Sequence, residues 1–139
     1  MNIKASIKNG KGQNEVVVET EGNEKSILIP AKDNGQGAAV NGGELLFLSL
    51  ATCFCNDVYR EAAKRKMEIE SVEVTVNGKF GAEGEPASLI EFETEIEAPR
   101  YPQEQIDDLI SYVNDVAEVH NTLRKGVQVT LKNRKVSSH

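Results

Sequence analysis

The stretch ELLFLSLATCFCND (residues 44–57) is the most apolar run of this chain, and it holds both cysteines, Cys53 and Cys55. No helix breaker follows before about residue 66, so the pattern predicts one long helix. Residues 45–55 are apolar nearly all round, which is typical of a helix buried on every side, whereas charges appear over residues 56–66. Because a chain of 139 residues cannot easily surround such a helix by itself, we expect a second copy to cover 45–55 in a homodimer.

The start of this helix carries a capping-box pattern. Asn41 is a candidate N-cap, and Glu44 follows three residues later, so each side chain can bond the other residue's backbone N–H. The turn-forming residues that fill 31–43 predict a loop before the helix. We therefore interpret Glu44 first as a cap and second as a candidate catalytic acid.

The rest of the chain predicts short antiparallel strands and one more helix. Strands are expected on both sides of the NGKG turn within 3–20, at 26–30, at 71–80 and 89–97 around the hairpin loop GAEGEP, and at 127–133 after Gly126, with the second helix at 101–118. The glutamates that alternate along 89–97 predict a solvated sheet face rather than a cation site. This order of elements predicts an α+β fold with mainly antiparallel pairing, in a single domain over residues 1–139.

Composition argues against two classes of partner. A net charge of −6, with four Phe, three Tyr and no Trp, provides neither the basic surface nor the stacking residues of a nucleic-acid-binding protein. The N-terminus lacks the apolar core of a signal peptide, and the run 45–55 is too short to span a bilayer. We therefore expect a cytoplasmic protein without nucleic-acid or membrane partners, in a compartment that keeps thiols reduced.

The two cysteines are too few for a disulfide framework, and their spacing turns the side chains about 200° apart on a helix. A metal site would need two more ligands, and His120 and His139 are the chain's only histidines. We expect neither a metal nor another cofactor. Cys53 and Cys55 can each be a small core residue; a reactive Cys53 would need a cation from another segment, because it lies too far from the start of its own helix.

The residues ELLxxSLATC, NDV and AAKR in the long helix, followed by VEVTVNGKF and NTLRKGVQV, together resemble the OsmC/Ohr family over roughly residues 40–133. The resemblance implies an OsmC-like fold, with antiparallel sheets packed on a long central helix that is buried between the subunits of an intertwined homodimer. It also implies a thiol-dependent reductase of organic hydroperoxides. In that family a first cysteine, activated by an arginine and a glutamate, becomes a sulfenic acid, which a second cysteine resolves to a disulfide. Cys53 matches the first cysteine.

The chain departs from the family pattern where the reaction needs its other groups. Ala117 stands at the position of the resolving cysteine, and Gly43 stands at that of the activating glutamate, with Glu44 beside it. No arginine precedes Arg60, so the activating arginine of the N-terminal strands is missing too. The two-cysteine cycle of the family therefore cannot run within this chain in its usual form.

Two residues are candidates to compensate for these losses. Cys55 is an extra thiol, although helix geometry turns it away from Cys53. His120 lies near the point where the family's second cysteine approaches the first, so it is a candidate to polarise Cys53 or to bind a ligand. The alternative interpretation of His120 is a solvated cap after the end of a helix.

Three functions remain open from the sequence, and all share the predicted homodimer. The leading prediction is reduction of organic hydroperoxides at Cys53, with Glu44, Cys55 and His120 as further site candidates and an external thiol as reductant. The first alternative is a non-catalytic dimer that binds a small apolar molecule in the cleft between subunits. The second is a cysteine redox sensor that uses Cys53 and Cys55.

Overall fold

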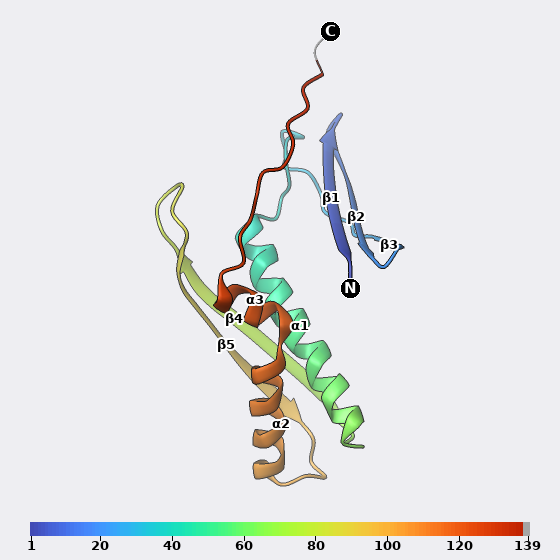
Figure 1. The fold of residues 1–139 in the computed structure, drawn as a ribbon, viewed down its shortest axis with the longest axis vertical. Coiled ribbons are helices and arrows are strands. Elements are labelled where there is room, and N and C mark those ends of the chain that lie inside the picture. Colours follow the sequence, from blue (N-terminus) through green and yellow to red (C-terminus); the bar gives the residue numbers. More distant parts are fainter. Residues whose placement is uncertain (138–139) are drawn as a thin grey trace. The chain divides into compact units, whose positions relative to one another are not determined.

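The structure is a computed structural model that describes residues 1–137, and it divides into two compact units, Met1–Leu46 and the part from Phe47 onward (Figure 1). Helix α1 (Gly42–Lys64) begins in the first unit and continues into the second. The predicted long helix is therefore confirmed. The combination of antiparallel sheets with helices also confirms the predicted α+β class.

The first unit contains an antiparallel sheet of three strands, β1 (Ile3–Gly10), β2 (Gln13–Thr20) and β3 (Asn23–Ser26), in the order β1-β2-β3. The two strands predicted around the NGKG turn are confirmed. The strand predicted at 26–30 is wrong, because the chain reverses immediately at Glu21 and Gly22, whose φ angles are 48° and 84°. Because the turn is tight, β3 pairs with β2 immediately after it, from Asn23 to Ser26. The third strand therefore ends at Ser26, the residue at which the predicted strand begins.

The loop predicted over 31–43 is confirmed up to the start of α1, and side chains of the sheet hold it. The amide of Asn14 donates to the carbonyl oxygens of Ile29 at 3.1 Å and Gly37 at 3.0 Å. The capping box is also confirmed: Oδ1 of Asn41 accepts from the N–H of Glu44 at 2.8 Å, and Oε1 of Glu44 accepts from the N–H of Asn41 at 2.9 Å. These two bonds fix the first turn of α1.

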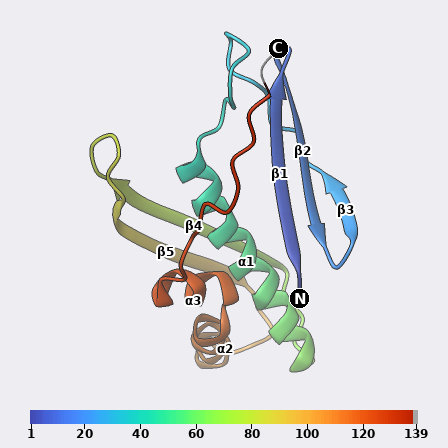
Figure 2. The same ribbon diagram turned by 45° about the horizontal axis from the view of Figure 1, so that its top comes forward.

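The second unit packs helices on one face of a hairpin made by β4 (Ser71–Phe80) and β5 (Ala87–Glu97), as Figures 1 and 2 show. The predicted alternation is confirmed, because Val72, Val74 and Val76 are half-buried toward the helices while their neighbours are exposed. The core joins the second half of α1 to α2 (Gln103–Val116). Its buried members are Phe54, Val58, Ala62, Met67, Ala98, Ile106, Leu109, Val113 and Ala117.

Burial along α1 differs from the sequence prediction. In this single chain Leu48, within the apolar half, is 59% exposed, whereas Asp57 and Glu61 in the charged half are buried. The core forms where α2 covers the second half of the helix, and the buried acids are accommodated by ion pairs with Arg60. One chain therefore leaves apolar surface of α1 uncovered.

The helix predicted over 101–118 is two helices, α2 and then α3 (Glu118–Lys125). Ala117 separates them with an extended backbone (φ −63°, ψ 110°) and a fully buried side chain. Neither Gly nor Pro marks this break, so tertiary packing sets it rather than local propensity. Gly126 ends α3 in the left-handed conformation, and its N–H bonds the carbonyl oxygens of Thr122 and Leu123.

The strand predicted at 127–133 is not formed in this chain. A strand is held by backbone hydrogen bonds to a neighbouring edge, and residues 127–133 pair with none of the strands that the structure describes. The alternating apolar side chains of this segment stand in solvent, with Val129 97% exposed. The segment therefore has the sequence pattern of a strand but no strand partner among the described residues.

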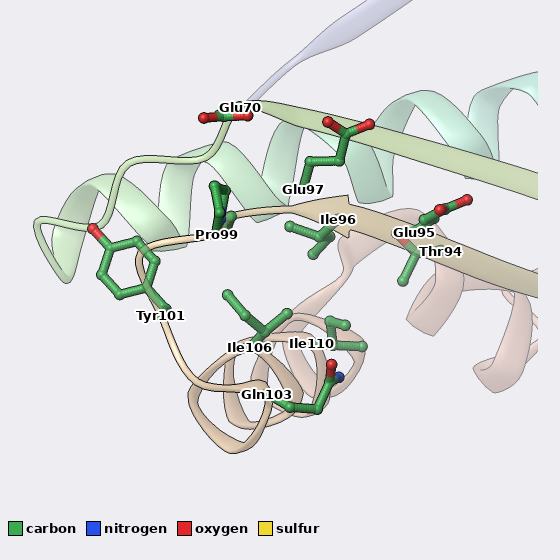
Figure 3. A pocket seen from close by; sticks show the side chains of 11 residues that line it. Glu70, Thr94, Glu95, Ile96, Glu97, Pro99, Tyr101, Gln103, Ile106 and Ile110 are labelled. Atoms are coloured by element: carbon green, nitrogen blue, oxygen red, sulfur yellow. The ribbon is translucent and has the colours of Figure 1, made fainter.

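The glutamates of the hairpin lie on its exposed face. Glu73 pairs directly with Glu95 across the strands, and like charges placed in this way do not stabilise the pairing. A hollow of about 600 Å³ lies between β5 and α2. In Figure 3, Ile96, Ile106 and Ile110 face one another there, and the carboxylates of Glu95 and Glu97 point away. The glutamates are exposed along both strands, which agrees with a solvated sheet face.

Among the described helices, none has the length and apolar character needed to cross a membrane.

Gly78 in β4 provides a test of how tightly the hairpin and α1 pack. A Cβ placed there would lie 2.4 Å from the carbonyl oxygen of Leu89 and 2.5 Å from the ring of Phe47, whereas one at Gly10 would meet nothing within 4 Å. We expect Gly78→Ala to lower the free energy of unfolding by about 1–3 kcal/mol, because a backbone atom has to move. Gly10→Ala, the matched control, should stay within about 0.5 kcal/mol of wild type in urea unfolding. Equal stabilities for the two variants would contradict this packing.

Candidate functional site

Cys53 lies in the middle of α1, and its half-buried sulfur meets the first turn of α3. The thiol donates a hydrogen bond to Oδ2 of Asp57, 3.6 Å away and one turn further along α1. The backbone N–H of Val119, in the first turn of α3, acts on the same sulfur and lowers the pKa of the thiol. Glu118 opens α3, and ligand atoms of Cys53, Asp57 and Glu118 lie within 4.8 Å of one another. A thiol, two carboxyl groups and a helix N-terminus therefore meet at one point.

Arg60 holds the acidic side of this cluster together. Its Nη1 lies 3.0 Å from Oδ1 of Asp57 and 3.1 Å from Oε1 of Glu118, so one guanidinium joins α1 to α3. Its Nε lies 2.9 Å from Oε2 of the buried Glu61. A planar guanidinium can serve several carboxylates in this way because its donors point in fixed directions.

The pKa values around Cys53 follow from these contacts. Burial raises the pKa of the Cys53 thiol, and the carboxyl groups of Asp57 and Glu118 raise it further, while the Val119 N–H opposes them. Burial and the neighbouring Glu118 also raise the pKa of Asp57. Glu118 has a lowered pKa, first because its own backbone N–H at the helix start stabilises its carboxylate. The resting state of Cys53 is thus the thiol rather than the thiolate.

His120 is not the solvated cap that the sequence suggested as its ordinary role. It lies within α3, its side chain is only 4% exposed, and its ring packs against those of Phe54 and Phe92 at centroid distances of 5.6 and 4.8 Å. The cause is the turn at Ala117, which starts a new helix before His120 and directs it inward. Burial, and then the charge of Arg124, lower the pKa of His120, which favours the neutral imidazole.

The other sequence candidates do not join the cluster at Cys53. The carboxylate of Glu44 is engaged in the capping box, where it accepts from the N–H of Asn41. Cys55 is a free, half-buried thiol two residues beyond Cys53, so helix geometry turns it to another side of α1. His139 lies outside the described residues. Of the four predicted site residues, Cys53 alone belongs to this cluster.

Cys53, Asp57 and Glu118 offer three potential metal ligands, and we tested them against that role. Arg60 already binds an oxygen of each carboxylate, and its positive charge offsets their attraction for a cation. Glu118 is also largely exposed, which would leave such an ion with a partly solvated shell. The cluster is better described as an ion-pair network that borders a thiol, and the absence of a metal remains a prediction.

Sequence reasoning missed Asp57, Arg60 and Glu118. A signal was available for the first two, because positions 53, 57 and 60 follow one face of a helix at spacings of four and three. The sequence identifies Arg60 only as the first arginine of the chain, whereas the resemblance to the OsmC/Ohr family implies an activating arginine earlier, in the N-terminal strands. Glu118 could not be found in this way, since only the fold brings α3 to α1.

The fold and the site define an α+β protein built around a long helix that carries a half-buried cysteine. A family model described as OsmC-like protein matches residues 35–132, which is well over half of the chain. The chain therefore belongs to the OsmC-like family, and the resemblance found in the sequence is confirmed. A search of curated proteins found no match to it.

Solved structures with the same fold come from several bacteria. An OsmC-like protein from Mycoplasma pneumoniae superposes with a TM-score of 0.68 at 15% identity, covering 91% of this chain and 89% of that one. An organic hydroperoxide resistance protein OsmC from Legionella pneumophila gives 0.59 at 21% identity, with 89% and 90% covered. The organic hydroperoxide resistance protein OhrB of Bacillus subtilis gives 0.54 at 18% identity, with 95% and 97% covered. At these identities the likeness concerns the fold.

Replacing Asp57 with Asn tests the electrostatics of the cysteine. The variant keeps the side chain's size and removes the carboxylate that raises the pKa of Cys53, so we expect a lower thiol pKa and more thiolate at neutral pH. Iodoacetamide alkylates the thiolate, so alkylation at about pH 7 should be several-fold faster in the variant than in wild type. The pH at which the alkylation rate increases should also be lower in the variant than in wild type. Intact-mass kinetics in a Cys55→Ser background report Cys53 alone.

The matched control is Asp108→Asn, which removes an exposed carboxylate on α2 and should leave the alkylation rate unchanged. A rate in Asp57→Asn equal to or below that of wild type would contradict the assignment of Asp57 as a group that holds Cys53 in its thiol form.

Proposed function

We propose that this chain reduces organic hydroperoxides at Cys53 in a one-cysteine cycle, with an external thiol as reductant. The observation that carries the proposal is the placement of the Cys53 sulfur between a hydrogen-bonded carboxyl group, Asp57, and the N–H of Val119 at the start of α3. Membership of the OsmC-like family and two structural neighbours named organic hydroperoxide resistance proteins support this choice of substrate.

The surroundings of Cys53 provide the groups that the first step requires. Asp57 accepts the thiol proton, and the raised pKa of its carboxyl group makes it a better base than an ordinary aspartate. The Val119 N–H, in the first turn of α3, stabilises the sulfur as negative charge develops on it. Arg60 balances the charge of the neighbouring carboxylates.

The step balances without any metal or organic cofactor. The sulfur attacks the terminal oxygen of the hydroperoxide, the O–O bond breaks, and the organic part leaves as an alcohol with the proton that Cys53 lost. Cys53 is then a sulfenic acid. An external thiol forms a mixed disulfide with it and releases water, and a second thiol molecule restores the Cys53 thiol and leaves as a disulfide.

A one-cysteine cycle follows from what surrounds the sulfur. Ala117, at the position of the family's resolving cysteine, is fully buried and carries no thiol. Cys55 cannot reach Cys53 while α1 remains helical, because disulfide geometry needs the two Cβ atoms to face each other. The sulfenic acid therefore depends on a thiol from outside the chain.

We further propose that the protein acts as a homodimer, in which a second copy covers the uncovered part of α1. Leu45 and Leu48 are exposed in the apolar half of this helix. The segment 127–133 has the alternation of a strand but no ladder within the described chain. An unpaired strand segment and an exposed apolar helix surface are both features that association with another chain would satisfy.

A second candidate function is binding of a small apolar molecule between the subunits without turnover. The raised pKa of Cys53 favours it, since a thiol is a poor nucleophile compared with a thiolate. A redox sensor would react once with an oxidant but would not turn over. The chemistry at Cys53 therefore separates all three possibilities.

The first test is trapping of the sulfenic acid. After brief exposure to cumene hydroperoxide with dimedone present, wild type and Cys55→Ser should each gain one dimedone adduct by intact mass, and Cys53→Ser should gain none. With dithiothreitol added, wild type should consume many equivalents of hydroperoxide. A dimedone adduct without turnover would indicate the redox sensor. No adduct in an excess of oxidant would rule out both thiol functions and favour the non-catalytic binding protein.

The dimer is tested by sedimentation equilibrium. We expect wild type to have twice the 15.2 kDa mass of one chain, and Leu48→Glu to shift the protein toward monomer by placing a charge on the uncovered surface of α1. Gln105→Glu adds the same charge on the exposed side of α2 and serves as the control. A wild-type protein that stays monomeric at micromolar concentration would disprove the dimer.

A further inference from the structure

His120 borders a small cavity on the side of α1 where Phe54 and Leu50 lie. The cavity has a volume of about 220 Å³, which suits a molecule of one ring rather than a drug-sized ligand. Residues of α1, β5 and α3 line it. Four of them are apolar, namely Leu50, Ile90, Phe92 and Leu123, and the other two are His120 and Arg124. Cys53 is not among them.

His120 lines this cavity without a hydrogen-bond partner for either ring nitrogen. Among residues 1–137, the only buried side-chain nitrogen or oxygen atoms without a hydrogen bond are Oγ1 of Thr94 and both ring nitrogens of His120. Thr94 lines an adjoining hollow of about 430 Å³, which shares Phe92 and Arg124 with the cavity. Buried polar groups are almost always paired, so an imidazole with both nitrogens unpaired beside a cavity is a place where a bound molecule would supply what the chain does not.

The chemistry of His120 determines what kind of group would pair with it. A neutral imidazole presents one N–H donor and one nitrogen acceptor. The nearby Arg124 is already engaged, since its Nη1 donates to the backbone oxygen of Asn114 and to Oδ1 of Asn121, and its Nη2 donates to Oδ1 of Asn114. The site therefore offers a neutral donor and acceptor in apolar walls, which matches a hydroxyl group better than a carboxylate.

We propose that this cavity binds a small neutral molecule with an aromatic or branched apolar body and a single hydroxyl group, which hydrogen-bonds to His120. The apolar body would lie against Leu50, Ile90 and Leu123. Because both ring nitrogens of His120 are buried, the imidazole would turn toward the cavity to meet the hydroxyl. The site belongs to one chain and is formed by residues other than those around Cys53. It therefore stands whether or not Cys53 reduces hydroperoxides.

Phenol and toluene are matched probes for this site, because they differ in one hydroxyl group. A purely apolar cavity prefers toluene, since phenol must give up its hydrogen bonds to water. If His120 supplies a partner, the order reverses. We expect the full-length protein to bind phenol at least about fivefold more tightly than toluene, as measured by amide chemical-shift titrations, and His120→Phe to lose that preference.

The proposal can also be tested on a protein that retains His120, so the test does not depend on whether the His120→Phe variant folds. The chain has two histidines, so the ring ¹⁵N signals of His120 can be assigned with a His139→Gln variant. Phenol should shift the ring ¹⁵N signals of His120. Toluene should shift the amide signals around the cavity but leave the ring signals of His120 nearly unchanged. Absence of phenol binding, tighter binding of toluene, or shifts confined to other regions would overturn the proposal.

Cys53→Ser separates this site from the proposed peroxidase. We expect it to bind phenol as wild type does, because Cys53 does not line the cavity. Loss of phenol binding in Cys53→Ser would place the molecule at the thiol instead and would overturn the inference. A protein that binds phenol at His120 but gives no dimedone adduct would retain this site and lose the proposed peroxidase.

Discussion

The contact between the start of α3 and the middle of α1 sets the chemistry of this molecule. Ala117 makes it possible, because its fully buried side chain and extended backbone end α2 and redirect the chain within one residue. From that turn, Glu118 and Val119 meet Cys53 on one side, and His120 packs against Phe54 on the other. One short turn therefore builds the surroundings of the thiol and one wall of a cavity.

Two opposing influences act on the sulfur, and their sizes explain which one prevails. Burial is the largest influence and raises the pKa of Cys53, and the Val119 N–H is the next largest and lowers it. The carboxyl groups of Asp57 and Glu118 act in the same direction as burial, and together they leave the pKa of Cys53 raised. Arg60 moderates this effect without reversing it, because its charge is shared among three carboxylates.

Local signals in the sequence predicted the elements whose formation depends on near neighbours. The Asn41–Glu44 capping box and the β4–β5 alternation form as expected, since each rests on contacts within a few residues or across one hairpin. The division of the second helix at Ala117 was missed because no glycine or proline marks it. The position of His120 was missed with it, since its burial depends on that break.

The predicted and the observed burial of residues 45–55 in α1 differ, and this difference bears on both Cys53 and the proposed dimer. The sequence predicts that 45–55 is covered, whereas one chain covers this half only in part and leaves Leu48 exposed. A second copy laid over this surface would remove more water from the neighbourhood of Cys53, and desolvation alone would raise its pKa further. Arg60 is already held by its own carboxylates, so a lower pKa of Cys53 needs a cation from another segment or from the second copy. In the proposed homodimer, the groups that the second copy brings to the sulfur would decide whether this fold supports catalysis or only binding.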